Sequence, residues 1–437
     1  IFLFMKLLAK LSFLLFLPVF IQAENLIVGY YPDWGKWNTP TYTWKEVPYE
    51  KMTHVLWSFI SPDSLGNLRG NAIDDPADLD SMVASAHKVN TKVIISLGGA
   101  GSCEYFASVS KDQNLRANFV HNLMNFIKDH NLDGVDMDWE YSSVPVASED
   151  TIAYNRLLAD IRDSLPQEKT LSAAIPCSGY YGKYFNVDAM KDKLDWFGFM
   201  TYDITGYWDD RARYNSPLYP NGNRTTWSWK ETAEYWGNRG VPAEKMVFGI
   251  PFFGFEFDAA TGPASTFNGN ATYVEYKNIC CKTDQEYFFD SLALVPYAIS
   301  SGSYTTFDDP KSASLKTQWV KDNQYAGVMI WEISQDIMED GSQPMLSAIY
   351  ETMQGTYNFI PFKKVSQKSG LTFANGILNF AKENQNFKNI SVSVRDVSGR
   401  EILIRSIKSG GSLDLSILTA GQYFVISPFG ALKVQIH

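Results

Sequence analysis

Cysteine and histidine are both scarce in this sequence. Its 437 residues include five histidines and only four cysteines, at positions Cys103, Cys177, Cys280 and Cys281. Four cysteines are too few to form a disulfide scaffold in a chain of this length. No CxxC or Cys/His spacing suggests a metal site, and so few histidines argue against a histidine nucleophile. We therefore expect neither a metal nor a cofactor.

Basic charge is also limited, and it is unevenly distributed. Residues 24–357 hold 26 basic and 44 acidic side chains, a net charge of −18. Residues 358–437 hold ten basic and four acidic side chains, a net charge of +6. The acidic main region argues against nucleic acid and anionic membranes as partners. The change of sign predicts a domain boundary near residue 358.

A long apolar run occurs only near the start of the chain. Lys6 and Lys10 precede or flank an apolar stretch at 11–20, and Ala23 supplies a small residue for cleavage. This pattern is typical of a signal peptide over residues 1–23, and the run is too short to span a bilayer. We expect the protein to be exported.

Short apolar, β-branched segments alternate with amphipathic ones along the main region. The predicted strands are 26–30, 53–59, 91–97, 133–140, 170–175, 195–202, 246–251 and 326–331. The predicted helices include 77–89, 112–130, 150–164, 228–238 and 310–323. Eight strands alternating with helices predict an α/β fold, a closed parallel TIM (β/α)8 barrel.

Two segments depart from this alternation. Residues 255–309 separate the seventh and eighth strands, and we expect a small α+β insertion before the last strand. Residues 358–437 contain short alternating strands with glycines at turns, which predicts a C-terminal β-sandwich domain. The expected organisation is therefore a signal peptide at 1–23, a barrel at 24–357 and the sandwich at 358–437.

The segment DGVDMDWEY at 133–141 carries the strongest chemical signal. Side chains alternate along a strand, so Asp136, Asp138 and Glu140 share one face while apolar residues occupy the other. Confined carboxyls repel one another and lose hydration, which raises the pKa of at least one. A carboxyl protonated near neutral pH suits general acid catalysis. Glu140 lies nearest the end of the strand where barrel active sites form, which favours it as the acid.

This segment resembles the DxxDxDxE signature of glycoside hydrolase family 18, the chitinases. Further segments that resemble the family, in order, are GYYPDW (29–34), SLGGAG (96–101), MTYD (200–203), GIPFFG (249–254) and WEISQD (331–336). The resemblance covers about residues 25–355. One departure is Phe253, where the family often has tyrosine, so a hydrogen bond near the seventh strand would be missing.

The resemblance implies a role for each matching residue. Glu140 would protonate the leaving oxygen and later activate water, while the substrate's own 2-acetamido oxygen attacks the anomeric carbon. Asp138 would orient that group, Asp136 would share a proton or a hydrogen bond with Asp138, and Tyr202 would donate to the acetamido oxygen. Substrate-binding or supporting roles are implied for Tyr30, Ser96, Gly99, Tyr141, Met200, Asp203 and Trp331. The resemblance also implies non-proline cis peptides at Ser58-Phe59 and Trp331-Glu332.

The expected activity is that of a monomeric, retaining chitinase acting on chitin or chitooligosaccharides. One alternative is an endo-β-N-acetylglucosaminidase acting on N-glycans, against which Trp139 and the insertion favour chitin. The other is a non-catalytic chitin-binding lectin, against which the presence of Glu140 argues. Trp34, Tyr207 and Trp208 are further candidates for stacking on sugars.

The C-terminal segment resembles the sorting domain of the bacterial type IX secretion system. The matching stretches are RDVSGREI (395–402), LDLSIL (413–418) and AGQYFV (420–425), with Lys433 near the end. The resemblance implies the type IX machinery as a partner and a location outside the cell or on the outer membrane. A carbohydrate-binding β-sandwich is the alternative, although the segment lacks tryptophan.

Overall fold

A computed structural model describes residues 25–140 and 148–357. In the C-terminal region it describes 371–374, 376–380, 389–396, 401–408, 410–427 and 430–436. The predicted signal peptide and Tyr141 lie outside the described residues. Within the described residues, no helix is both long and apolar enough to cross a bilayer.

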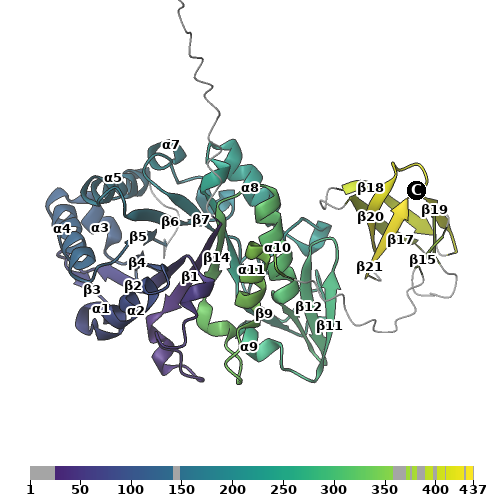
Figure 1. Ribbon diagram of the computed structural model, residues 1–437, viewed down its shortest axis with the longest axis horizontal. Helices are drawn as coiled ribbons and strands as arrows, with labels where there is room; N and C mark the ends of the chain where they lie inside the picture. Colours follow the sequence, from purple (N-terminus) through teal and green to yellow (C-terminus); the bar gives the residue numbers. More distant parts are fainter. Residues whose placement is uncertain are drawn as a thin grey trace, which may run out of the picture.

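Eight parallel strands form a closed barrel (Figure 1). They are β1 (Leu26–Pro32), β2 (His54–Pro62), β4 (Lys92–Gly98), β5 (Gly134–Asp138), β6 (Thr170–Pro176), β7 (Trp196–Met200), β8 (Met246–Pro251) and β14 (Gly327–Trp331). Neighbours follow the order β1-β14-β8-β7-β6-β5-β4-β2, and pairing of β1 with β2 completes the ring. The short β3 (Leu68–Arg69) pairs with β2 in antiparallel fashion. The predicted closed parallel barrel is confirmed.

Two strands end earlier than the sequence predicts. β5 ends at Asp138 and β7 at Met200, each two residues before the end of the predicted run. After β7 the backbone turns, because the N–H of Thr201 donates to the carbonyl of Phe199 at 2.8 Å instead of to a neighbouring strand. Glu140 and Tyr202 therefore lie just beyond the carboxyl ends of their strands, where a barrel opens.

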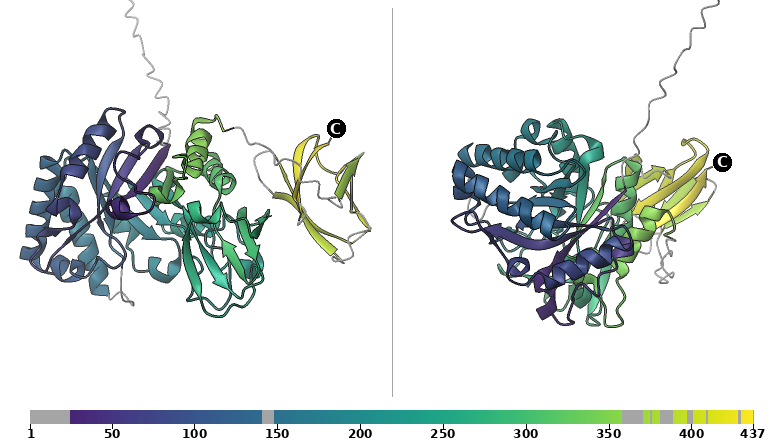
Figure 2. Two further views of the ribbon diagram at one scale, coloured as in Figure 1. Left: turned by 90° about the horizontal axis from the view of Figure 1, so that it is seen from below. Right: turned by 60° about the vertical axis from the view of Figure 1, so that its left-hand side comes forward.

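Helices surround the ring of strands (Figure 2). The longer ones are α2 (Ala77–His87), α4 (Gln113–Asp129), α5 (Ser148–Ser164), α8 (Trp229–Asn238), α10 (Pro310–Asp322) and α11 (Pro344–Gln354). Shorter helices are α1 (Asn71–Asp74), α3 (Phe106–Lys111), α6 (Gly179–Gly182), α7 (Val187–Met190) and α9 (Tyr276–Ile279), with 3-10 turns η1 (Asp33–Trp37), η2 (Tyr49–Lys51), η3 (Gly222–Arg224), η4 (Ala243–Lys245) and η5 (Ile333–Asp336). Local sequence sets some of these bounds: Asp309 and Ser312 form a capping box at the start of α10.

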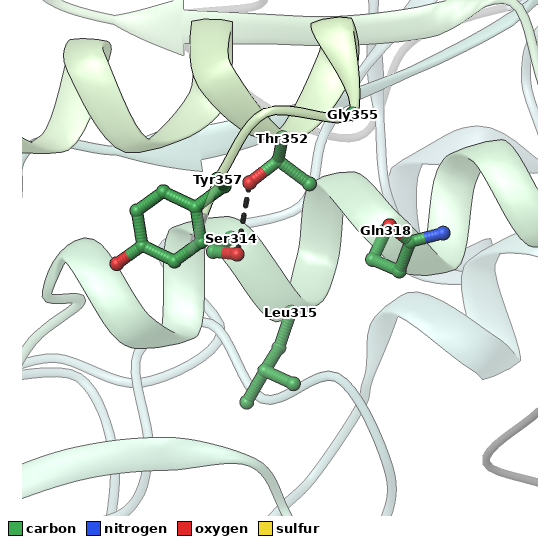
Figure 3. A pocket seen from close by; sticks show the side chains of 6 residues that line it. All are labelled: Ser314, Leu315, Gln318, Thr352, Gly355 and Tyr357. Carbon is green, nitrogen blue, oxygen red and sulfur yellow. Dashed lines mark hydrogen bonds between the residues drawn. The ribbon is translucent and has the colours of Figure 1, made fainter. Parts of the chain in front are cut away.

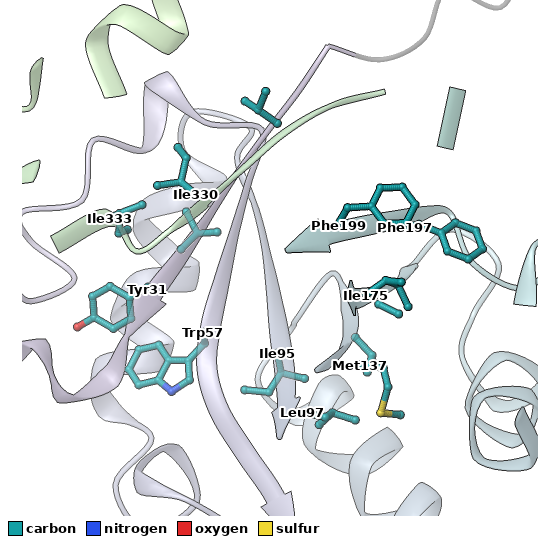
Figure 4. Close-up of a cluster of buried hydrophobic side chains, with 14 of the residues drawn as sticks. Tyr31, Trp57, Ile95, Leu97, Met137, Ile175, Phe197, Phe199, Ile330 and Ile333 are labelled. Atoms are coloured by element: carbon teal, nitrogen blue, oxygen red, sulfur yellow. The ribbon is translucent and has the colours of Figure 1, made fainter. Parts of the chain in front are cut away.

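The main hydrophobic core lies between the strands and the helices. Met137, Ile175 and Phe199 are fully buried members of one cluster from three different strands (Figure 4). Val135 and Trp139 belong to the same cluster, which covers the apolar face of the acidic segment as its alternation predicts. Asp136 and Asp138 consequently face the inside of the barrel.

A five-stranded antiparallel sheet stands between β8 and β14. Its strands are β9 (Phe253–Asp258), β10 (Ala271–Glu275), β11 (Gln285–Asp290), β12 (Val295–Ser300) and β13 (Ser303–Thr306), in the order β10-β9-β13-β12-β11. With α9 they occupy the interval in which the sequence predicts an α+β insertion. Because β9 begins two residues after β8 ends, this sheet starts directly at the barrel mouth.

The C-terminal region contains two small antiparallel sheets. One comprises β15 (Leu371–Ala374), β16 (Ile377–Phe380) and β19 (Ser412–Asp414); the other comprises β17 (Asn389–Asp396), β18 (Glu401–Lys408), β20 (Gly421–Ser427) and β21 (Gly430–Ile436). Leu378 from the first sheet and Val392 from the second lie in one hydrophobic cluster. The alternating strands predicted for this region are therefore present.

Candidate active site

Asp136 occupies the centre of a ring of hydroxyl groups. Tyr30 and Ser96 donate hydrogen bonds to its Oδ2 at 3.0 and 2.8 Å, and Ser172 donates to its Oδ1 at 2.7 Å. Register explains two of these contacts, since Ser96 and Ser172 are the direct partners of Asp136 on β4 and β6. Burial raises the pKa of Asp136, and the three hydroxyl donors oppose that rise.

Asp138 lies one step closer to the barrel mouth and is bound less completely. Its side chain is buried, and its Oδ1 has no hydrogen-bond partner among the described residues. Burial, followed by repulsion from Glu140 and Asp136, raises the pKa of Asp138 well above its usual value. An unpaired buried oxygen is costly, and a ligand that offers an N–H or O–H group would satisfy it.

Glu140 is the most open of the three carboxyls. It is half-buried, whereas Asp136 and Asp138 are buried. Burial raises the pKa of Glu140, and a hydrogen bond from the backbone of Ala100 partly offsets this effect. Within the described part of the chain none of these three carboxyls forms an ion pair, so protonation is the available way to relieve their repulsion.

Cys103 fixes the backbone beneath Glu140. Its buried Sγ accepts a hydrogen bond from the N–H of Glu140 at 3.3 Å and contacts the carbonyl oxygens of Gly99 and Asp138 at 3.4 and 3.7 Å. The thiol thereby links the segments that follow β4 and β5. Burial raises the pKa of Cys103 to about 12, so the group remains a thiol.

Glycine at position 99 allows an aromatic ring to approach the site. Gly99 has a φ of +78°, and a Cβ there would lie 2.4 Å from the ring of Phe59. The amide of Gly99 donates to the carbonyl of Asp138 at 2.8 Å, which joins this turn to the acidic segment. A larger residue would be strained in backbone conformation and would displace Phe59.

Trp331 lies at the end of β14 among several other rings. Its ring centroid is 5.8 Å from that of Phe59, 5.5 Å from Tyr30 and 6.3 Å from Trp34. The predicted cis peptides at Ser58-Phe59 and Trp331-Glu332 are confirmed. The half-buried indole therefore provides an apolar surface beside the ring of hydroxyls around Asp136.

Tyr202 and Asp203 follow β7 on another side of the mouth. Tyr202 is buried, and burial followed by the charges of Asp138 and Asp203 raises its pKa well above the usual value, so it stays a donor. Asp203 has a φ of +55°, and its N–H donates to Asn215 Oδ1 at 2.9 Å. Asp203 is exposed, yet the surrounding protein limits the hydration of its carboxyl. This desolvation, followed by the charge of Glu140, raises the pKa of Asp203 to about 7. A carboxyl that is reached by solvent but poorly hydrated is typical of a concave site.

The remaining predicted residues take up different positions. Met200 ends β7 and packs against the hydrophobic cluster that contains Tyr30 and Tyr202. Of the three candidates for sugar stacking, Trp34 contacts the Trp331 group, whereas Tyr207 and Trp208 are exposed after β7. The structure thus brings together the carboxyls, the hydroxyls and the rings around Trp331, while Tyr207 and Trp208 lie apart from them and Tyr141 lies outside the described residues.

Sequence reasoning did not identify three residues that the structure places at the site. Ser172 donates to Asp136, Cys103 binds the backbone of Glu140, and Tyr273 extends from the insertion toward the mouth. Strand register could have indicated Ser172. No sequence motif contains Cys103 or Tyr273 in a functional position.

A separate hollow lies between α10 and α11, in the outer helical layer. It has a volume of about 240 Å³ and is lined by Ser314, Leu315, Gln318, Thr352, Gly355 and Tyr357 (Figure 3). Thr352 donates a hydrogen bond to Ser314 at 2.9 Å, and the six lining residues include no carboxylate. The carboxyls of the acidic segment lie at the barrel mouth instead.

These features define a barrel of the glycoside hydrolase type, and comparison with known proteins identifies the family. Residues 26–336 match the model of glycosyl hydrolases family 18, and the chain belongs to this family. Curated proteins that it resembles include some named endochitinase or chitinase. An endochitinase from Manduca sexta is 26% identical, with 71% of this chain and 63% of that protein covered. Chitinase A1 from Niallia circulans is 25% identical, with 71% and 56% covered. The chain thus spans less than two thirds of either relative.

Solved structures share the fold. The Group IV chitinase of Ostrinia furnacalis has a TM-score of 0.71 and 23% identity, with 76% of this chain and all of that chain covered. A chitinase from Rhizomucor miehei has a TM-score of 0.66 and 25% identity, with 75% of this chain and all of that chain covered. Both likenesses cover about three quarters of this chain.

Proposed function

We propose that this protein is a chitinase that hydrolyses β-1,4-linked N-acetylglucosamine polymers with retention of configuration. The observation that carries the proposal is that Glu140 and Asp138 lie side by side with different environments. Glu140 is only half-buried and its pKa is raised, while Asp138 beside it keeps one buried oxygen unpaired. The first can deliver a proton to a substrate oxygen, and the second can accept the N–H of an acetamido group.

In the first step Glu140 donates its proton to the glycosidic oxygen as the bond between that oxygen and the anomeric carbon breaks. The acetamido oxygen of the same sugar forms a bond to the anomeric carbon, giving a cyclic oxazolinium ion and releasing the leaving sugar as an alcohol. Asp138 holds the acetamido N–H and stabilises the positive charge. Asp136, held by three hydroxyls, would share a proton or a hydrogen bond with Asp138.

In the second step the Glu140 carboxylate takes a proton from water. The resulting oxygen nucleophile attacks the anomeric carbon, the bond to the acetamido oxygen breaks, and Glu140 is again an acid. Two inversions give net retention. Tyr202 remains protonated throughout and would donate to the acetamido oxygen, while Trp331 would form the apolar floor under the sugar.

Several supporting roles complete the proposed site. Asp203 would bind sugar hydroxyls, Tyr30 and Ser96 would hold the inner carboxyl, and Gly99 and Met200 would shape the mouth. Tyr141 stays a prediction. Structural relatives support the substrate class: the Ostrinia furnacalis Group IV enzyme has been solved with allosamidin, and a Group II mutant from the same organism with a penta-N-acetyl chitooligosaccharide.

The decisive experiment combines substrate choice with stereochemistry. The purified protein should cleave colloidal chitin and N-acetylated chitooligosaccharides, and time-resolved NMR should show the β-anomer of the product first. Fully deacetylated chitosan should not be cleaved, because the nucleophile is the acetamido group. Initial release of the α-anomer would refute the mechanism. Cleavage of N-glycans but not chitin would indicate an endo-β-N-acetylglucosaminidase, and binding of chitin without turnover would indicate a lectin.

We further propose that the protein is exported and acts as a monomer outside the cell or on its outer surface. The charge and apolar pattern of residues 1–23 and the resemblance of residues 358–437 to a type IX sorting domain support this proposal. The C-terminal sheets, proposed to form a sandwich, should be dispensable for cleavage of soluble oligomers. A truncation after residue 357 that retains oligomer cleavage but is no longer delivered outside the native host would support it. Loss of binding to insoluble chitin alone would instead indicate a carbohydrate-binding domain.

A further inference from the structure

A row of aromatic rings leads away from the catalytic groups along the insertion. Tyr202 meets Phe253 edge-on at 5.7 Å, and Phe253 stacks on Tyr273 at 4.4 Å with an angle of 19° between the rings. Tyr273 meets Phe255 at 6.1 Å, and Phe255 meets Trp208 at 6.0 Å. The register explains this row: Tyr273 on β10 lies opposite Phe255 on β9 and diagonal to Phe253, so the three rings share one face.

Tyr273 is exposed in a way that packing alone does not require. Its side chain is 42% accessible although one face of its ring lies on Phe253. Phe253 contacts both rings, so it joins Tyr273 to Tyr202. Tyr273 therefore lies on the wall of the same concave site as Tyr202 and Asp203, with part of its surface open to a ligand.

The hydroxyl of Tyr273 is oriented by a buried amide. Gln335 on η5 is only 5% exposed, and its Nε2 donates to the Tyr273 oxygen at 2.7 Å. With the Gln335 amide oriented in this way the phenol oxygen accepts, so its proton is left to donate, and no other described side chain accepts it. Gln335 lies four residues after Trp331, so the contact also ties the insertion to the strand end that carries the indole floor.

From this arrangement we infer that Tyr273 is a substrate-binding residue of this chain, which donates its hydroxyl proton to an acceptor oxygen of the sugar next to the one over Trp331. Gln335 is the positioning residue that holds the phenol in place. The neighbouring rings of Phe253 and Phe255 have no polar atoms, so Tyr273 provides the hydrogen bond on this part of the wall. The inference rests on the proposed function and extends it to a contact outside the barrel strands.

The test compares Tyr273→Phe with a matched control. Tyr273→Phe removes one oxygen and keeps the ring stack, so KM for N-acetylated chitooligosaccharides should rise about three- to tenfold while kcat changes less than about twofold. The control is Tyr287→Phe, which removes a hydroxyl of similar exposure on β11, at the opposite edge of the same sheet. Its KM should stay within error of the unaltered enzyme.

Gln335→Leu tests the positioning role. It should raise KM in the same direction, and combining it with Tyr273→Phe should add little, because both changes remove one shared contact. An unchanged KM for Tyr273→Phe, an equal rise for Tyr287→Phe, or fully additive effects would each overturn the inference.

A separate arm distinguishes this inference from the proposed function. If the unaltered protein cleaves no chitooligosaccharide, the proposed catalysis fails, and calorimetric binding of the penta-N-acetyl oligomer decides the remaining question. Weaker binding by Tyr273→Phe than by the unaltered protein and Tyr287→Phe supports the contact. Equal binding by all three proteins, or no binding by any, overturns it.

Discussion

The two sides of the barrel mouth are held together in different ways. On the side around β5, Asp136 receives three hydrogen bonds from hydroxyls on β1, β4 and β6, and a thiol binds the backbone N–H of Glu140. On the side formed by β8, β9 and β10, rings of Phe253, Phe255 and Tyr273 are fixed by stacking. Hydrogen bonds impose a strict geometry, whereas ring contacts give graded energies. The first side therefore suits bond breaking and the second suits binding.

Glu140→Gln should produce the largest difference between the sides. Glutamine has nearly the same shape but cannot deliver a proton, and general acid catalysis contributes about 10²–10⁴-fold. Because one group serves both steps, we expect kcat to fall by at least about 10⁴-fold with KM little changed. Steady-state kinetics on a soluble oligomer, with circular dichroism to establish folding, measures this effect. Activity within tenfold of the unaltered enzyme would contradict the role of Glu140.

Asp138→Asn should be the next most damaging change. It removes the negative charge beside a cationic intermediate but keeps an oxygen for the acetamido N–H. Loss of one preorganised electrostatic group costs about 10²–10³-fold in kcat. Asp78→Asn is a suitable control, because Asp78 is an acid on α2 whose ion pair with Lys36 is partly exposed. A kcat loss of less than about fivefold would show that Asp138 does not stabilise the intermediate.

Cys103→Ala should have a moderate effect that reveals how the acid is held. Alanine removes the sulfur that accepts the Glu140 N–H at 3.3 Å and should lower kcat about fivefold, since a net hydrogen bond is worth about 1 kcal/mol. Cys103→Ser should recover part of the loss. Cys177→Ala, also at the end of a barrel strand, provides the control. The measurement is kcat as a function of pH. If both alanine variants lower kcat equally and shift the alkaline limb of this profile equally, the effect is a general packing defect.

On the aromatic side, the substitution Glu332→Gln should change how the free energy of unfolding of the protein depends on pH. Glu332 is buried, and burial raises its pKa from 4.5 to about 7. Between these values the folded protein holds a proton that the unfolded chain has lost, so the free energy of unfolding falls as pH rises from about 4.5 to about 7. In the variant, the fall in the free energy of unfolding over this pH interval should be smaller by on the order of 2 kcal/mol. Denaturant unfolding at pH 4.5, 5.5 and 7 measures it, and parallel curves for both proteins would contradict the assignment.

The sequence predicts the barrel better than it predicts the surroundings of the acids. Apolar runs buried on both faces mark the eight strands, and alternation along one strand places Asp136, Asp138 and Glu140 together. Ser172, in contrast, contributes only because register brings β6 level with Asp136. Cys103 and Tyr273 come from a loop and an inserted strand, and their partners are set by tertiary packing. Contacts between elements far apart in the chain leave no local periodicity to recognise.

Closure of the barrel has a consequence for the order in which the protein can be made. β14 pairs with β1, with Gly327 opposite Leu26, so the ring of strands is complete only when a late segment meets an early one. Until then both strands present unpaired edges, and Trp331 is not beside Tyr30. A chain emerging from the ribosome would therefore carry its acidic strand long before it carries a working site. Folding must also wait for this long-range contact, which places the protein among slowly assembling topologies.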